Sequence, residues 1–171
     1  MNKRQRDPFL TVMRNAGMLA VLLGASPASA DTLAVAAGSG NFKSHDSNAA
    51  FLSYQKNAPE LFNHESLYDF TLGYWNGSTR SSALTFARVV RWKISPEGYL
   101  AGTLGIGAVD RTTDHLGTQG QFILRLAYGR QFGKYDLSIG ETHYSNGQIV
   151  FHWHGPNVGE DFLTLQVGRE F

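Results

Sequence analysis

The chain has 171 residues, with 15 Lys and Arg against 14 Asp and Glu, and it contains no cysteine. This near-neutral charge argues against a nucleic-acid partner, and the fold cannot depend on disulfides. The 19 glycines, 11 phenylalanines, seven tyrosines and three tryptophans indicate sheet rather than helix.

Residues 1–30 have the pattern of a cleaved export signal. Basic residues come first, at Lys3, Arg4, Arg6 and Arg14, and an apolar run at 16–24 follows. Ala28-Ser29-Ala30 is a small-residue cleavage site, so we expect the mature chain to start at Asp31. An uncleaved membrane helix is disfavoured, because a span needs roughly 20 apolar residues.

The mature chain, residues 31–171, is long enough for one domain. Four of the 15 Lys and Arg and one of the 14 Asp and Glu lie in the signal, which leaves 11 basic and 13 acidic residues. No helical periodicity of useful length follows Asp31. Segments of alternating polarity appear instead, each near the length of a tilted membrane strand, about 9–11 residues. We predict strands at 32–42, 48–57, 66–76, 81–94, 98–109, 119–132, 134–146 and 159–171.

The polarity of the two strand faces distinguishes a membrane barrel from a soluble sandwich. In the segment 119–132, Phe122, Leu124 and Leu126 share one face, and Gln121 and Arg125 share the other. A small and polar opposite face suits a narrow lumen with an apolar exterior. The sequence therefore predicts an all-β fold, an eight-stranded antiparallel transmembrane β-barrel of the outer-membrane type. Arg88 interrupts one apolar face.

The connections support this prediction. Tight turns at 95–98 and 132–134 alternate with longer loops at 110–118 and 147–158, as in outer-membrane barrels. With both termini in the periplasm, the loops after odd-numbered strands lie outside the cell. The segment 58–65 is an exception, because we expect it to form a long periplasmic turn. The chain ends in an aromatic residue, Phe171, as these barrels commonly do.

A candidate catalytic pair lies at the outer end of the seventh predicted strand. His143 and Ser145 are two residues apart and therefore share a face. An imidazole beside a hydroxyl is the pair that makes serine nucleophilic. The same face carries Ile139 and Leu137, so the pair points toward lipid. Taken alone, His-x-Ser is more often a polar strand end at the membrane boundary.

Three carboxylates are candidates for the group that orients His143. If the loop 147–158 is centred near residue 152, position 143 lies across from Asp161, which shares its outward face. Glu160 points to the lumen by parity. Glu141 is on the same strand and face as the histidine. Parity therefore favours Asp161, with the other two left open.

Two further features follow the serine. Asn146 and Gly147 offer a side-chain amide and a backbone N–H that could receive an oxyanion, although Asn-Gly is also a common turn. His152 and His154 form an H-x-H pair that could bind a metal, but no third ligand is evident, and an exposed loop is the better interpretation.

The run His143-Tyr144-Ser145-Asn146, followed by Asn157-Val158-Gly159 and a last alternating strand, resembles the lipid A 3-O-deacylase (PagL) family. The resemblance extends upstream through Gly73-Tyr74-Trp75, 104–107 and 116–132. It implies an eight-stranded outer-membrane barrel that cleaves the 3-position ester of lipid A without a cofactor. By the motif, Ser145 is the nucleophile, His143 the base, and Asn146 with a nearby glycine the oxyanion hole.

Two positions differ from the family pattern. Asp161 stands where the family usually has a glutamate, and Ser-Asn-Gly stands where it often has Ser-Asn-Ala-Gly. We expect lipopolysaccharide and the bacterial outer membrane to be the partners, with no nucleic acid and with the oligomeric state open. The alternatives are a structural or adhesive barrel without catalysis, and a barrel esterase that acts on another acyl lipid.

Overall fold

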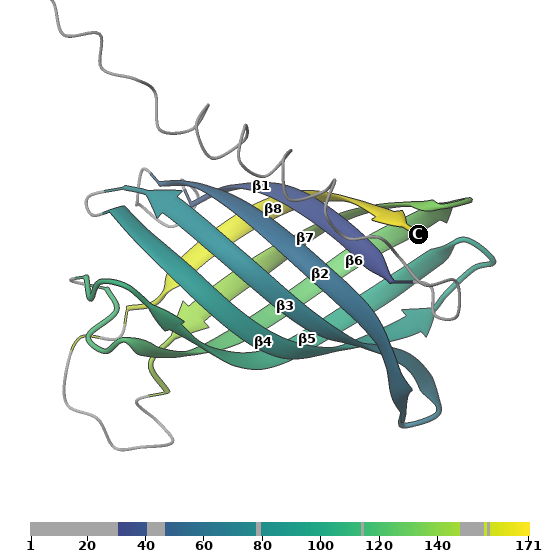
Figure 1. Cartoon of the computed structure of the whole chain (residues 1–171), viewed down its shortest axis with the longest axis horizontal. Coiled ribbons are helices and arrows are strands. Elements are labelled where there is room, and N and C mark those ends of the chain that lie inside the picture. Colours follow the sequence, from purple (N-terminus) through teal and green to yellow (C-terminus); the bar gives the residue numbers. More distant parts are fainter. Residues whose placement is uncertain (1–30, 41–46, 78–79, 114, 148–155, 157) are drawn as a thin grey trace, which may run out of the picture.

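The computed structural model describes residues 31–40, 47–77, 80–113, 115–147, 156 and 158–171. Eight antiparallel strands form a closed barrel in chain order, and β1 pairs with β8 to complete it (Figure 1). The strands are β1 Thr32–Ser39, β2 Asn48–Leu61, β3 His64–Asn76, β4 Arg80–Lys93, β5 Gly98–Val109, β6 Gly120–Phe132, β7 Tyr135–Ser145 and β8 Glu160–Glu170. The predicted fold class and strand order are confirmed. Among the described residues, no helix is long and apolar enough to span a membrane.

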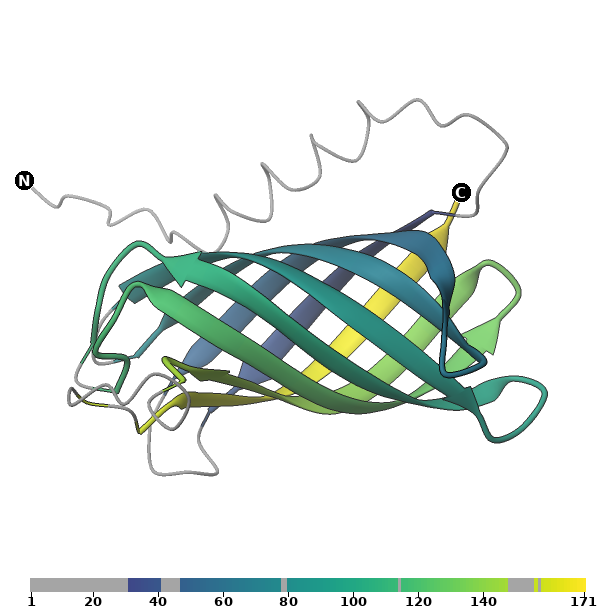
Figure 2. The same ribbon diagram turned by 90° about the horizontal axis from the view of Figure 1, so that it is seen from below.

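The two ends of the barrel differ. The turns β2–β3, β4–β5 and β6–β7 and the C-terminus lie at one end, and the longer connection between β5 and β6 lies at the other, with the strands strongly tilted between them (Figures 1 and 2). At the short-turn end, Gly133 adopts a left-handed conformation with φ 59° between β6 and β7. This asymmetry is the outer-membrane pattern, in which the short turns face the periplasm.

The prediction of a long turn at 58–65 is wrong. β2 continues to Leu61, and only Phe62 and Asn63, at φ 55° and 60°, separate it from β3. Two consecutive residues with positive φ make a tight hairpin turn whose twist matches that of the strands. A bulge between Ala58 and Leu61 absorbs the irregular sequence around Pro59.

The same bulge accounts for the charge that interrupts the apolar face of β4. Arg88 Nη2 donates a hydrogen bond to the Pro59 carbonyl oxygen and another, of 2.8 Å, to Ser66 Oγ. Its guanidinium carbon lies 4.6 Å from the centre of the Tyr68 ring. The arginine therefore satisfies a carbonyl that the bulge removes from the strand ladder.

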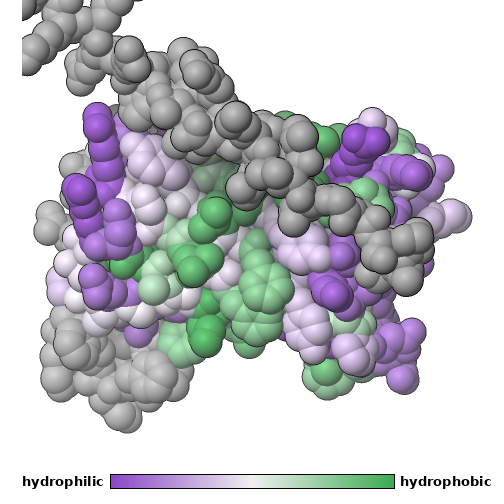
Figure 3. Space-filling model, in the orientation of Figure 1, coloured by the Kyte–Doolittle hydropathy of each residue, from purple (hydrophilic) through white to green (hydrophobic). Residues whose placement is uncertain are grey.

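The outward face is apolar. Exposed large hydrophobic side chains form a band across the middle of the barrel, and hydrophilic residues lie toward both ends (Figure 3). In a protein surrounded by water this would be a costly surface, whereas a lipid-facing band is required of a transmembrane barrel. Members of the band include Leu72, Leu84, Leu104, Ile106, Leu126, Ile139, Leu163 and Leu165.

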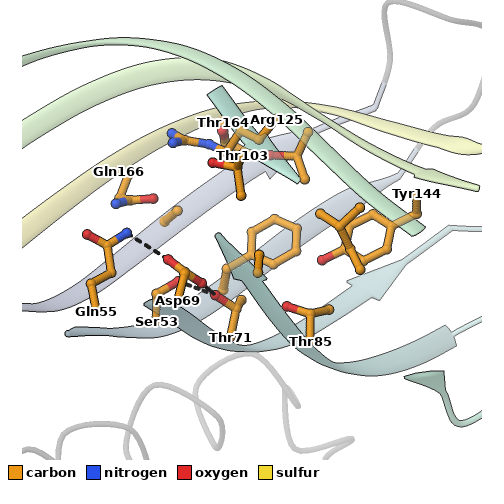
Figure 4. Close-up of a pocket in the computed structure, with 15 residues that line it drawn as sticks. Ser53, Gln55, Asp69, Thr71, Thr85, Thr103, Arg125, Tyr144, Thr164 and Gln166 are labelled. Atoms are coloured by element: carbon orange, nitrogen blue, oxygen red, sulfur yellow. Dashed lines mark hydrogen bonds between the residues drawn. The ribbon is translucent and has the colours of Figure 1, made fainter. Parts of the chain in front are cut away.

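The lumen is filled by side chains in layers. A polar layer that includes Gln55, Asp69 and Thr71 occupies the middle, with Gln55 Nε2 donating to Asp69 Oδ2 at 2.7 Å (Figure 4). Apolar clusters that include Trp75 and Leu67 lie in different parts of the lumen. The cavity left in the polar layer measures about 40 Å³, which is room for a few water molecules. Because the lumen is packed, a reaction of a larger molecule must take place on the outer surface or at the rim of the barrel.

Candidate active site

A histidine and an aspartate meet at the loop-bearing end of β7 and β8. His143 and Asp161 are direct cross-strand partners, as the sequence register predicts. His143 Nδ1 lies 2.8 Å from Asp161 Oδ1, within hydrogen-bond distance. The His143 side chain is 35% exposed and the Asp161 side chain 8%. The aspartate is thus shielded while the imidazole remains accessible from the lipid-facing side.

Ser145 lies two residues beyond His143 on β7, at the last position of the strand. Its cross-strand partner on β6 is the outward-facing Phe122. Positions two apart on a strand are separated by roughly 6–7 Å along the chain and point to the same side. Because Nδ1 of His143 is engaged by Asp161, Nε2 is the ring nitrogen left to exchange a proton with a hydroxyl.

The other two candidate acids are placed differently. Glu160 points to the opposite face from Asp161, and its Oε1 lies 3.1 Å from His115 Nδ1. Glu141 is exposed on the outward face, with Leu126 and Leu163 as its cross-strand partners. Of the three carboxylates, Asp161 is the one that directly pairs with His143 across the strands.

Asn146 and Gly147 directly follow the end of β7. Asn146 is 5% exposed, and its Nδ2 donates a 2.8 Å hydrogen bond to the Pro156 carbonyl oxygen. Gly147 has φ 64°, a left-handed conformation that suits glycine. The pair therefore keeps an amide donor beside Ser145.

Aromatic packing on the inward face holds these strand ends in place. Tyr144, which separates His143 from Ser145, is 1% exposed, and Phe162, next to Asp161, is fully buried. Their rings lie 6.3 Å apart and both contact Trp75, at centroid distances of 5.2 and 5.5 Å. Because successive residues on a strand point to opposite faces, the packing of Tyr144 and Phe162 on the inward face fixes the positions of His143, Ser145 and Asp161 on the outward face.

Comparisons with known proteins identify the family. A family model described as lipid A 3-O-deacylase (PagL) matches residues 44–170. The chain belongs to the PagL family. No curated protein matches the chain. Family membership makes the protein an ester hydrolase of the lipid A 3-O-deacylase type, and the family and the barrel together place it in the outer membrane.

Two solved structures share the barrel fold of this PagL-family chain. The crystal structure of the outer membrane enzyme PagL is 20% identical, with a TM-score of 0.58, and the match covers 81% of this chain and 98% of that one. The outer membrane protein Ail of Yersinia pestis, in a phospholipid bilayer nanodisc, is 10% identical, with a TM-score of 0.54 and coverage of 84% and 99%. At these identities the structures support the fold alone.

Gly159 packs against the imidazole of the candidate site in this PagL-family chain, a contact that sequence reasoning missed. It has φ 86°, and a Cβ added there would lie 2.5 Å from His143 Cε1. Both the backbone conformation and the space beneath the imidazole therefore require glycine. The signal available in the sequence was a glycine two residues before the acid, where the last strand begins.

The lipid-facing surface beside the PagL-family site is hollowed. One hollow of about 490 Å³ reaches Asn146, and Gly107, Gly120 and Phe122 are among the residues that line it. A second, of about 350 Å³, shares Phe122 and Ile106 with it. A cross-strand row runs from the loop-bearing rim over five consecutive strands, β7 to β3, and consists of Ser145, Phe122, Ile106, Phe86 and Phe70.

The possible metal pair, His152 and His154, lies outside the described residues. Among the residues that the structure does describe, no group of three or more His, Cys, Asp or Glu side chains is arranged to hold a metal ion.

Proposed function

We propose that the protein removes the 3-O-linked acyl chain of lipid A by a Ser-His-Asp mechanism. The observation that carries the proposal is the 2.8 Å contact of His143 Nδ1 with Asp161 Oδ1 on the face that also carries Ser145. In a serine esterase the acid holds the histidine tautomer and stabilises the imidazolium, and the histidine takes the serine proton. The chemistry fits the ester hydrolase class of the family.

The steps follow from this arrangement. Ser145 Oγ attacks the acyl carbonyl carbon while its proton passes to His143 Nε2. The tetrahedral oxyanion accepts hydrogen bonds from Asn146 Nδ2 and the Gly147 backbone N–H. Collapse of this intermediate breaks the ester bond, and His143 gives the proton to the departing sugar oxygen, which leaves as a hydroxyl. Water then hydrolyses the acyl-serine with His143 again as the base, which releases the fatty acid.

The location of the site suits a lipid substrate. We infer that the loop-bearing end is extracellular, so that an outward-facing serine at that rim meets lipid A in the outer leaflet. The substrate approaches laterally, and the apolar hollows beside Ser145 and Asn146 accept an acyl chain that stays in the membrane. We also propose that residues 1–30 are removed on export, which N-terminal sequencing of the membrane protein would test.

The experiment is a comparison of lipid A from cells with and without the protein. The proposal predicts a mass loss equal to one 3-hydroxyacyl chain in the cells that contain it. Purified protein should release the same acid from lipid A but not from phospholipid in mixed micelles. Unchanged lipid A would favour a structural or adhesive barrel, and release from phospholipid would favour an esterase for another acyl lipid.

A further inference from the structure

A second histidine–carboxylate pair lies directly behind the candidate triad. His115 belongs to the connection between β5 and β6, and its Nδ1 is 3.1 Å from Glu160 Oε1. Both side chains are shielded, at 17% and 8% exposure. The esterase mechanism proposed above uses neither residue, although Glu160 is the immediate neighbour of Asp161. Burying polar groups is costly unless they have partners. The contact between His115 and Glu160 therefore stabilises this part of the rim.

Hydrogen bonds hold Thr113, His115 and Leu116 together. Thr113 N donates to the Leu116 carbonyl oxygen at 3.0 Å, and Thr113 Oγ1 accepts from the backbone N–H of Leu116 at 2.9 Å and of His115 at 3.1 Å. Leu116 is fully buried in the apolar cluster that contains Tyr144 and Phe162. Leu116 therefore anchors this connection in the mouth of the barrel.

Backbone contacts join this connection to the start of β8. The Gly159 N–H donates to the His115 carbonyl oxygen at 3.2 Å, next to the side-chain pair of His115 and Glu160. Two residues later the Gly117 N–H donates to the Pro156 carbonyl oxygen at 2.9 Å. A Cβ on Gly117 would lie 2.7 Å from that oxygen, so the approach depends on glycine.

The Pro156 carbonyl also holds Asn146. The same oxygen accepts the 2.9 Å bond from Gly117 N and the 2.8 Å bond from Asn146 Nδ2. A side-chain amide has two N–H donors, and this bond uses one of them and fixes the plane of the group. The orientation of the Asn146 amide thus depends on where the Pro156 carbonyl lies.

We propose that His115 and Glu160 are positioning residues for the oxyanion hole. Their contact fastens the connection that carries His115 to β8. The same connection holds the Pro156 carbonyl through Gly117, and the carbonyl orients Asn146. The inference rests on the proposed function, because it takes Ser145 as the nucleophile and Asn146 as an oxyanion donor. Removing a whole donor lowers kcat by about 10²–10³, so loss of its orientation has a smaller effect, on the order of tenfold.

The test measures kcat and KM for release of 3-hydroxy fatty acid from purified lipid A in detergent micelles. His115→Ala and Glu160→Ala should each lower kcat about tenfold with KM little changed. Glu160→Gln keeps an acceptor for the His115 ring and should recover most of the rate. Thr112→Ala, at an exposed position of the same connection, is the matched control and should behave as the unmodified protein. A gel-mobility shift on heating reports barrel folding in every variant.

A double-mutant cycle with Asn146→Ala separates positioning from general stabilisation. If His115 acts through Asn146, adding His115→Ala to Asn146→Ala lowers kcat no further. The proposal would be overturned if the fold-losses in kcat of the two single variants multiply in the double variant, or if the only effect is on KM. If His115→Ala does not fold, Glu160→Ala takes its place in the same cycle. Wild-type kcat in folded His115→Ala would overturn the positioning role alone, whereas activity in Ser145→Ala would remove the serine mechanism itself.

Discussion

Phe122 lies directly opposite Ser145 on the neighbouring strand, on the outward face of the barrel. The first side chain across from the candidate nucleophile is therefore an aromatic ring that lines both apolar hollows. Ser145 therefore lies next to the surface that would hold its substrate, and mutations can test the shape of that surface.

Filling the hollow next to Phe122 should reduce activity without disturbing the fold. A Cβ added at Gly120 would meet no atom within 4 Å, so Gly120→Leu places its side chain in open space. We expect at least a tenfold fall in kcat/KM for lipid A, because the added atoms occupy the acyl path. A single extra or missing methylene in an apolar pocket is worth about 1–3 kcal/mol. Leu72→Phe, on the outward face of β3, is the control. Full activity in Gly120→Leu would show that the acyl chain lies elsewhere.

The identity of the acid can be tested by neutral, isosteric changes. Asp161→Asn should abolish most deacylation, because an amide cannot stabilise the imidazolium that His143 forms. Glu160→Gln should retain most of it, since Glu160 faces His115 and not His143. Rates of fatty acid release from purified lipid A decide the matter. An equal or larger loss in Glu160→Gln would overturn the assignment, and modest losses in both would point to Glu141.

Gly159→Ala should inactivate a barrel that still folds. The new Cβ would lie 2.5 Å from His143 Cε1 at a residue with φ 86°, so the imidazole must move away from Asp161 and Ser145. Gly133→Ala is matched in backbone conformation, at φ 59°, but its Cβ would contact nothing within 4 Å in a turn at the opposite end. Equal activities of the two variants would mean that steric fit beneath the imidazole is unimportant.

Activity should persist when metal ions are removed. The proposed steps use only side-chain and backbone groups, so a chelator added to the purified protein in micelles should leave the rate of deacylation unchanged. A loss of activity that added metal restores would instead favour a metal site at His152 and His154.

Strand periodicity explains why so much of the site was predictable. A period of two fixes which residues share a face, so the side of the barrel that carries His143, Ser145 and Asp161 follows from their parity. The hairpin register then pairs His143 with Asp161, as the structure confirms. Glu160, one residue away, had to face the other side.

The features that the sequence did not predict have a different physical origin. The β2–β3 hairpin was mistaken for a loop because Pro59 and the polar residues near it break the alternation, and a bulge restores the register beyond them. A turn with Phe62 at positive φ is also uncommon for a bulky residue. The contact of His115 with Glu160 joins a connection to a strand far along the chain, and no local pattern reports such a pairing.

The most direct test of the account is the activity of folded Ser145→Ala. Release of 3-hydroxy fatty acid from purified lipid A is measured beside the heat-induced gel shift that reports barrel folding, with Ser82→Ala as a control serine on the outward face of β4. We predict that Ser145→Ala folds and loses nearly all activity, that Ser82→Ala keeps it, and that adding His143→Ala to Ser145→Ala lowers the residual rate little, because triad members are not additive. Full deacylation by correctly folded Ser145→Ala would contradict the serine mechanism.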